Sequence, residues 1–275
     1  MNENVKWIAA AVAVVGLSVG AILYFGQRDK AAAPEPVATE LPAPPPVAEE
    51  PPIKHPVPEA ERKEPLPSLA DSDKPMQGAL VDLLGQDPVQ RFVVPENLVR
   101  HFVVTIDNLP EQKVAQRLRP LRPVPGTFAV GGTEEQPVLD PTNYARYEPL
   151  MQLLRNTSTP RLIETYTRYY PLFQDAYADL GHPPQYFNDR LIEVIDHLLA
   201  TPEVQGPIAL SRPGVLYEYA DPAIESLSAG QKLLIRMGAQ NAAQVKDKLR
   251  ELRVALIASP SSAPAQAQPD EAAVN

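Results

Sequence analysis

The 275-residue sequence contains no cysteine, one tryptophan and four histidines. The lack of cysteine excludes disulfide bonds, a thiolate nucleophile and any zinc or iron–sulfur site built on cysteine within this sequence. Glycine is scarce beside proline, with 13 glycines against 33 prolines, so much of the chain is not folded core. We therefore expect one folded domain accompanied by extended, proline-rich sequence.

Several catalytic and nucleotide-binding motifs are also missing. The sequence has no H-E-x-x-H, no Walker glycine loop followed by Lys-Ser or Lys-Thr, and no G-x-G-x-x-G. Acidic residues outnumber basic ones, 34 to 25, which gives a net charge of -9. This balance argues against nucleic acid as a partner, because binding to phosphates needs a basic surface. The sequence predicts no catalytic residue, no metal ligand and no cofactor.

One long hydrophobic run lies near the start of the sequence. Residues 7–25 (WIAAAVAVVGLSVGAILYF) carry no charge, and a bilayer core needs roughly 20 such residues. A cleaved signal peptide is the alternative, but its apolar part usually spans only about 7–15 residues. We predict a single-pass transmembrane helix. Small residues at Ala9, Ala13, Gly16 and Gly20 would let two such helices pack closely, although a lone anchor fits the same pattern.

The charges around this run give almost no preference for its orientation. Lys6 precedes it, and Arg28 and Lys30 follow it, so the positive-inside rule is nearly balanced. The proline-rich stalk that comes next is useful outside a bacterial inner membrane. We therefore expect the N-terminus in the cytoplasm and the chain from Gln27 onward in the periplasm. The expected partners are the bilayer and an envelope protein or cell-wall component.

Composition divides the chain into four parts. Residues 1–28 hold the membrane anchor. Residues 29–75 contain 13 prolines and a net charge of -5, which predicts a disordered, extended linker, or alternatively a ligand for proline-binding modules. Residues 259–275 have little apolar bulk and predict a disordered tail. The interval 76–258 is the predicted folded domain, long enough for one well-buried core.

Helical periodicity dominates this folded interval. Helices are predicted at about 79–84, 98–106, 110–119, 144–154, 159–180, 188–199, 228–237 and 241–256. Two short strands, 208–210 and 215–219, are predicted around an Arg-Pro-Gly turn. The expected helix starts include Asn188, and Ser228 with Gln231 as a capping box. The fold class is therefore mainly α with a small β-hairpin or short sheet.

The best cluster of polar side chains lies on the sixth predicted helix. Asp189, Glu193 and His197 follow one another at four-residue steps, with Asp196 adjacent. Three metal ligands would share one helical face in this way, but so does the solvated or ion-paired face of any amphipathic helix. The solvated face is the favoured interpretation. A partner surface that also includes Tyr186 is the first functional alternative, and a metal site is the second.

Nine of the ten tyrosines lie between positions 144 and 219. Tyr166, Tyr170 and Tyr177 keep the spacing of a buried stripe. Tyrosines off this stripe are predicted at the surface: Tyr147, Tyr169 and Tyr186. Carboxylates far apart in sequence could also meet in an enzyme's cleft, and the residues considered for this role are Asp175, Asp179, Glu193 and Asp196.

Four segments of the sequence resemble a known family. They are NYARYEPL, TRYYPLFQDAYADLG, YFNDRLIEVIDHLLATPEVQGPIALSRPGVLYEYADP and LSAGQKLLIRMGAQNAAQVKDKLRELR. The family is the bacterial membrane-anchored domain of unknown function 3014, and the resemblance covers about residues 76–258. It implies one N-terminal membrane helix, a variable proline-rich linker and a mostly helical domain. It implies no catalytic residues, because no activity is assigned to the family.

Two functions from different classes remain open. The favoured one is a non-enzymatic envelope protein that binds or scaffolds a partner. The alternative is a carboxylate-dependent enzyme that acts on the cell wall or on small molecules. A deep pocket that joins acidic and aromatic side chains would favour the enzyme, whereas an exposed apolar patch would favour binding.

Overall fold

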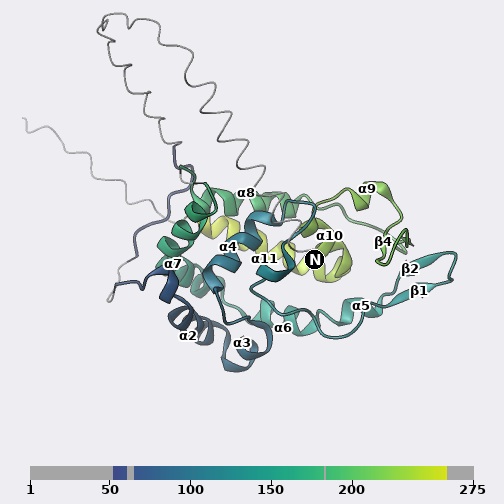
Figure 1. Cartoon of the computed structure of the whole chain (residues 1–275), viewed down its shortest axis with the longest axis horizontal. Helices are drawn as coiled ribbons and strands as arrows, with labels where there is room; N and C mark the ends of the chain where they lie inside the picture. Colours follow the sequence, from purple (N-terminus) through teal and green to yellow (C-terminus); the bar gives the residue numbers. More distant parts are fainter. Residues whose placement is uncertain (1–51, 61–64, 183, 259–275) are drawn as a thin grey trace, which may run out of the picture. The chain divides into compact units, whose positions relative to one another are not determined.

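The computed structural model describes residues 52–60, 65–182 and 184–258 (Figure 1). The predicted membrane helix at 7–25, with its small residues Ala9, Ala13, Gly16 and Gly20, lies outside these residues, as do most of the predicted linker and the predicted tail. Within the described ranges, no helix is both long and apolar enough to span a membrane.

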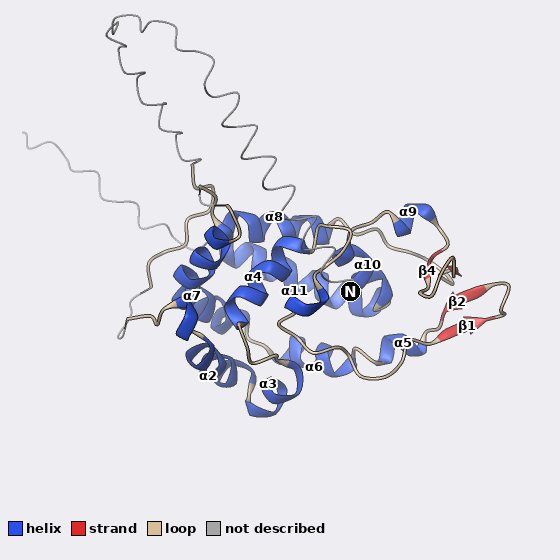
Figure 2. Ribbon diagram, viewed as in Figure 1, coloured by secondary structure: helices blue, strands red, loops and turns tan. Residues whose placement is uncertain are grey.

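Helices dominate the described part of the chain, and two short antiparallel hairpins accompany them (Figure 2). The α-helices are α2 (Asp73–Leu84), α3 (Gln86–Phe92), α4 (Leu98–Asn108), α5 (Thr142–Ala145), α6 (Glu148–Asn156), α7 (Thr159–Asp179), α8 (Phe187–Leu199), α9 (Pro222–Glu225), α10 (Ala229–Arg236) and α11 (Ala239–Ala258). Short 3-10 helices occur at Leu69–Asp71 and Gln116–Leu118. The prediction of a mainly helical domain with a small antiparallel sheet is confirmed.

The two hairpins lie side by side. Strands β1 (Val130–Gly132) and β2 (Pro137–Leu139) form the first, and β3 (Leu210–Ser211) and β4 (Glu218–Tyr219) form the second. A hydrogen bond from the Leu139 N–H to the Ile208 carbonyl joins them. The sequence predicted the second hairpin, whereas the pairing of β1 with β2 was not expected. In Figure 1 the hairpins lie beyond α5 and α10, away from α2 and α3.

The main hydrophobic core lies between α2, α4, α7 and α8. Rings from three elements meet there: Phe102 on α4 lies 5.3 Å from Phe173 on α7 and 6.2 Å from Phe187 on α8, centroid to centroid. Phe187 is completely buried, and Tyr177 is 1% exposed. Aromatic contacts of this kind stabilise a core beyond the area that they bury. They fix α8 against α4 and α7, and thereby set the direction of the polar face of α8.

A second group of apolar side chains joins α6, α8, α10 and α11. α10 lies close to α8 because Gly230 has no side chain: a Cβ there would lie 2.6 Å from a methyl group of Leu198. The predicted capping box at the start of α10 is present, with the Ser228 hydroxyl accepting from the Gln231 N–H and the Gln231 side chain accepting from the Ser228 N–H. The start of α10 is thereby fixed beside α8.

Some predicted elements differ from the structure. The helix expected at 110–119 is only a 3-10 turn at Gln116–Leu118, because the prolines that flank this segment leave little room for a longer helix. Asn188 is not a cap. Tyr186 occupies that position, and Asn188 is a fully buried residue inside α8. Tyr147 and Tyr169, expected at the surface, are 5% and 4% exposed, because packing against α8 and α2 decides their burial.

The folded part also begins earlier than residue 76. Val57, Leu66 and Leu69, from the range predicted as linker, pack against the main core, and α2 starts at Asp73. Proline content alone suggested an unpacked chain, but apolar residues between the prolines supply surface that can be buried. We call residues 52–57 the strap, because they cross over α8.

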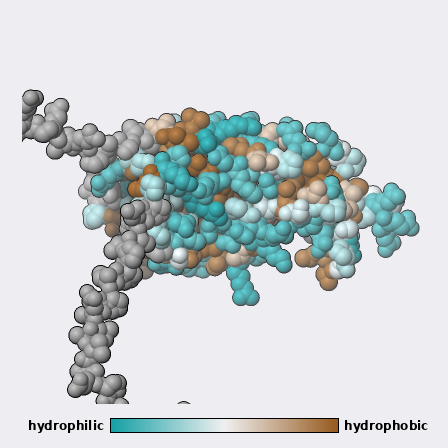
Figure 3. Space-filling view, turned by 90° about the horizontal axis from the view of Figure 1, so that it is seen from above, coloured by the Kyte–Doolittle hydropathy of each residue, from teal (hydrophilic) through white to brown (hydrophobic). Residues whose placement is uncertain are grey.

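Most of the surface is hydrophilic, and apolar side chains form separate patches on the face shown in Figure 3. The most exposed large apolar side chains in the described ranges are Val215 and Leu216, at 83% and 77%. They lie in the loop between β3 and β4, at the tip of the second hairpin. Single exposed side chains of this kind are common in soluble domains and carry no argument alone.

Candidate functional site

The polar face of α8, by which we mean the side chains of Asn188, Asp189, Arg190, Glu193, Asp196 and His197, binds the strap. The Asp189 carboxylate accepts hydrogen bonds from the Lys54 and His55 N–H groups, at 3.0 and 2.8 Å. The Asn188 side-chain amide donates to the His55 carbonyl at 2.8 Å, and its oxygen accepts from the Tyr166 hydroxyl at 3.0 Å. Three backbone groups of two successive strap residues are therefore held by side chains of α8.

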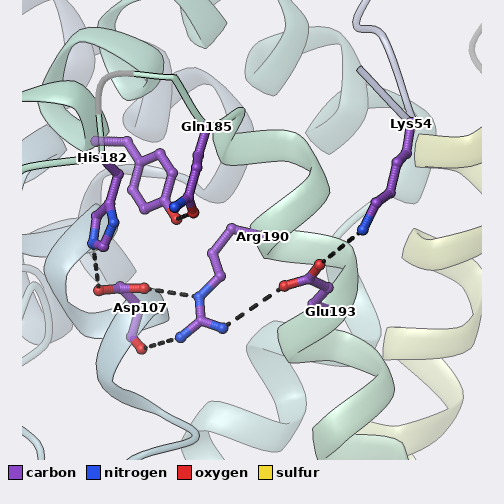
Figure 4. Close-up of polar contacts among 7 residues, drawn as sticks. Lys54, Asp107, His182, Gln185, Arg190 and Glu193 are labelled. Atoms are coloured by element: carbon purple, nitrogen blue, oxygen red, sulfur yellow. Dashed lines mark hydrogen bonds and ion pairs between the residues drawn. The ribbon is translucent and has the colours of Figure 1, made fainter. Parts of the chain in front are cut away.

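A chain of charged contacts continues from the strap to the end of α4 (Figure 4). The Lys54 ammonium lies 3.3 Å from Glu193, and Glu193 lies 3.8 Å from Arg190. Arg190 donates to both the side chain and the backbone carbonyl of Asp107, at 2.8 and 3.0 Å. His182 lies 3.7 Å from the other Asp107 oxygen. The network joins three separate parts of the chain around α8.

Aromatic and amide groups support this network from one side. The Tyr177 ring stacks on His182 with centroids 4.7 Å apart, and its hydroxyl donates to Gln185 at 3.2 Å. Burial raises the pKa of Tyr177, and the negative charge of Asp107 raises it further, so the hydroxyl stays protonated as a donor. The Tyr177 hydroxyl is thus a hydrogen-bond donor that lies on the same side of the network as His182.

The remaining polar residues of α8 also contact other helices. Both carboxylate oxygens of Asp196 accept from Arg253 on α11, and the same bonds raise the pKa of the Arg253 guanidinium. The His197 Nε2 lies 2.8 Å from the Ser228 hydroxyl, and Gln231 donates to the His197 carbonyl at 3.3 Å. Tyr186 is half-buried at the start of α8. Of the predicted surface, the four polar residues Asp189, Glu193, Asp196 and His197 contact other parts of the same chain.

The sequence alternatives can now be compared with the geometry. Asp189, Glu193 and His197 share a face of α8, but each has a different intramolecular partner. Throughout the part of the chain that the structure describes, no three His, Asp or Glu side chains are grouped so that they could hold a metal ion. The use of this face by an external partner stays a prediction.

The carboxylates considered for an enzyme's cleft have separate partners. Asp179 pairs with Arg100 at 2.7 Å, Glu193 pairs with Lys54, and Asp196 pairs with Arg253. Asp175 is exposed on α7. In the described part of the chain, these ion pairs join the three carboxylates to different partner segments: the strap, α4 and α11.

A pocket of about 360 Å³ lies between α2, α4, α7 and the segment at 120–121, and we call it the apolar pocket. Its walls include Leu80, Leu84, Phe102, Ile106, Leu121 and Leu162. Tyr166 is the one ionisable side chain in its lining, and burial raises the pKa of Tyr166 well above its ordinary value. The volume lies in the range of about 300–1,000 Å³ that is typical of ligand pockets.

The polar atoms that line the apolar pocket are already satisfied. The Thr105 hydroxyl donates to the Leu118 carbonyl, the Thr165 hydroxyl donates to the Arg161 carbonyl, and the Tyr166 hydroxyl donates to Asn188. Leu121, at the wall, is 47% exposed, so the pocket is accessible from solvent. The described lining of the pocket is therefore suited to bind apolar groups.

Sequence patterns did not reveal the residues that hold the strap and the charged network in place. Asn188 was taken for a cap, and the pairing of Arg190 with Asp107 connects residues 83 positions apart, which no local spacing reveals. A signal for the strap was present, since Val57, which packs against the main core, is an apolar residue within the proline-rich range.

Comparison with known proteins gives one family. The model of the family described as "Protein of unknown function (DUF3014)" matches residues 98–253, which run from α4 to α11. The comparisons with curated proteins and with solved structures found no significant match. The strap and α2 precede the matched region, while Asn188, Asp189 and Glu193, which hold the strap, lie within it. The chain belongs to the DUF3014 family of proteins of unknown function.

Proposed function

We propose that this protein is a single-pass, membrane-anchored bacterial envelope protein whose domain is a non-enzymatic binding or scaffolding module. The observation that carries the proposal is the apolar pocket. It has the size of a binding site, and the polar atoms in its lining are already hydrogen-bonded within the chain. Such a pocket gains binding free energy from the burial of apolar groups.

The proposed occupant is an apolar segment of a partner protein in the envelope. Helix α2 and helix α4 form two walls of the pocket, and the segment at Pro120 and Leu121 forms a rim. A helix or an extended peptide places apolar anchors in such a groove, and those anchors give most of the binding free energy.

The strap supports the scaffolding part of the proposal. Because Asn188, Asp189 and Glu193 hold residues 54 and 55, the chain that leads back to the proposed anchor joins the domain at a defined place. The strap therefore fixes the point at which the linker leaves the domain, and the proline-rich residues before it would act as the spacer.

The membrane and periplasmic parts of the proposal come from the sequence. Residues 7–25 are uncharged and long enough for one span, and the proline-rich stretch follows them. A phosphatase that is active only in the periplasm, fused after Pro75, should be active in intact cells. The same fusion with residues 7–25 deleted should be inactive. Activity of a cytoplasmic reporter at Pro75 would contradict the proposed orientation.

Site-specific crosslinking tests the binding role. A photo-crosslinking residue placed at Leu121, on the rim of the apolar pocket, should capture a defined envelope protein from intact cells. The same residue at Val254, which is 66% exposed on α11, is the control and should not capture that protein. Equal capture from both positions would contradict a pocket-directed partner.

An enzyme is the alternative class, and its prediction differs. If the domain acted on a substrate through Glu193 or Asp196, the Glu193→Gln or Asp196→Asn variant would fail to complement a strain in which the gene is deleted. Crosslinking from Leu121 would stay unchanged in these variants. Our proposal expects the reverse: Leu80→Asp, in another wall of the pocket, abolishes capture from Leu121, and the exposed Val254→Asp variant does not.

A further inference from the structure

A second cavity, of about 350 Å³, lies where the end of α10 meets the start of α11. The loop at 201–206, which follows α8, forms one wall, and Ile208 and Leu234 contribute apolar surface. Along α11 the lining side chains are small, namely Ala239, Ala242 and Ala243, and the last residue of this face is Lys246. We call this space the lysine cavity. It is separate from the apolar pocket and has room for a small organic molecule.

Lys246 is buried, with 9% of its surface exposed. Its ammonium group donates one hydrogen bond, to the Thr201 carbonyl at 2.6 Å. Among the described residues, no carboxylate lies within ion-pair distance of it. An ammonium group has three N–H donors, so this cation has donors to spare and no counter-charge. A buried charge without a partner is costly, and proteins usually pair such a charge.

Other lysines with buried stems show the usual arrangement. Lys248, two residues further along α11, contacts Glu251 at 2.7 Å and two oxygens of other residues. Lys232 on α10 contacts Glu225 at 2.7 Å. Both are half-buried, whereas Lys246 is buried, yet both have a carboxylate. Of these three lysines, Lys232 lines a pocket of only about 60 Å³ together with its partner Glu225, whereas Lys246, which has no acid beside it among the described residues, lines the cavity of about 350 Å³.

The surroundings of the cavity favour a negatively charged ligand with an apolar body. The first two turns of α11 line the cavity, and the start of a helix carries partial positive charge. Tyr144 packs its ring against Gly238, where a Cβ would lie 2.7 Å from the ring, so the wall at the helix start is closely built. The one acidic residue in the lining is Glu203, which is exposed in the loop.

We propose that the lysine cavity binds a small organic carboxylate. The carboxyl group pairs with the Lys246 ammonium, and a short apolar body lies against Val204, Ile208 and Leu234. Val204 is half-buried, and the other two are buried, so the apolar body would be removed from water on binding. A free acid and the C-terminal end of a peptide share this chemistry.

Equilibrium dialysis of the full-length protein against hexanoate tests the proposal, with protein-free detergent as the blank. Hexanoate should bind saturably with one site per chain. Hexanol and hexylamine have the same chain length without the negative charge, and they should bind at least about tenfold more weakly, since a charge-assisted hydrogen bond contributes about 1.5–3 kcal/mol. Equal binding of hexanol would overturn the role of Lys246.

Two variants locate the site. Lys246→Met should weaken hexanoate binding about tenfold or more, whereas Lys248→Met removes the same charge from the same helix and should leave binding unchanged. Ala243→Phe fills the cavity from an exposed position and should also abolish binding. If Lys246→Met fails to fold, the Ala243→Phe variant decides. Hexanoate binding that survives Ala243→Phe overturns the proposal.

A pair of peptides distinguishes the two sources of the carboxylate. Acetyl-Ala-Leu with a free carboxylate and the same peptide with a C-terminal amide differ only in charge. Binding of the first peptide and not of the amide assigns the cavity to chain ends, and binding of hexanoate alone assigns it to small acids. Failure of hexanoate and of the free peptide to bind overturns the proposal, while capture from Leu121 would be unaffected, so the proposed function is tested separately.

Discussion

The polar face of α8 and the lysine cavity both carry charged side chains, but among the described residues only the first contains ion pairs. On α8, Glu193 has two basic neighbours and Asp196 has one. In the cavity, the one partner of the buried Lys246 ammonium among the described residues is the Thr201 carbonyl. Ion pairs within the chain hold its parts together. A buried charge without a counter-charge is instead a place where a ligand can supply the opposite charge.

The difference shows which property indicates a binding site. Four-residue spacing brought Asp189, Glu193 and His197 to attention, yet spacing reports only that residues share a helical face. Whether such a side chain is available to a ligand depends on its contacts within the chain. For these residues the contacts come from distant segments: the strap for Asp189 and the N-cap of α10 for His197. Four predictions can strengthen or break this contrast, and the first has the largest expected effect.

Asn188→Ala should destabilise the domain by about 2–4 kcal/mol, since it leaves a cavity and unsatisfied buried polar groups. The Tyr166 hydroxyl would lose its acceptor, and the His55 carbonyl would lose its donor. Chemical denaturation of the full-length protein, followed by circular dichroism, measures the free energy of unfolding.

Asn156→Ala is the control for this variant. Asn156 is the last residue of α6 and is exposed, so the change should stay within about 0.5 kcal/mol of the wild type. Equal effects of the two substitutions would mean that the polar face of α8 does not hold the fold together.

Asp189→Ala should have a smaller and more local effect of about 1–2 kcal/mol, because it removes two acceptors for backbone N–H groups of the strap. The amide protons of Lys54 and His55 should exchange faster with solvent, while those of α4 and α7 keep their protection. Hydrogen exchange measured by mass spectrometry checks this. Uniformly faster exchange would show that the strap is part of the main cooperative unit.

Sequence patterns predicted the class of the fold well. Apolar periodicity located α4, α7 and α11, and local chemistry marked the capping box of α10, since both signals depend on residues close together in the chain. The strap was missed for the opposite reason. Its packing depends on Asn188 and Asp189, more than 130 positions away, and a high proline content resembles an unpacked linker.

The sites were harder to predict than the fold. Nothing in the sequence neighbours of Lys246 tells it apart from Lys248. Lys246 is buried, and its ammonium group donates to the carbonyl of Thr201 in the loop after α8, which is distant in sequence. The apolar pocket also needs α2, α4 and α7 together, and periodicity cannot show whether a buried stripe is fully covered.

Replacing Lys246 and replacing Lys248, the two lysines of α11, should have different effects on the free energy of unfolding of the ligand-free protein. Lys248→Met should lower the free energy of unfolding by about 1 kcal/mol, since it breaks a partly buried ion pair and leaves polar oxygens without a donor. Lys246→Met should be nearly neutral, because the loss of one bond to Thr201 is offset by removal of an unpaired buried charge. Chemical denaturation of both variants measures the difference. A larger loss for Lys246→Met would argue against an unpaired charge.

The smallest effect concerns pH and the paired lysine of α10. Burial alone would raise the pKa of Glu225, but the bonds from Lys232 and from the Tyr219 N–H outweigh it and hold that pKa below its ordinary value. A carboxylate whose pKa is lower in the folded state stabilises the fold above its unfolded pKa, about 4.3, and this stabilisation is lost as the pH falls through the folded pKa. The Glu225→Gln variant should therefore be less stable than the wild type at pH 7, and the difference should shrink below about pH 4. Unfolding measured at both pH values checks this, with the exposed Glu203→Gln as the control. A difference that stays constant with pH would mean that the charge of Glu225 does not contribute to the pair.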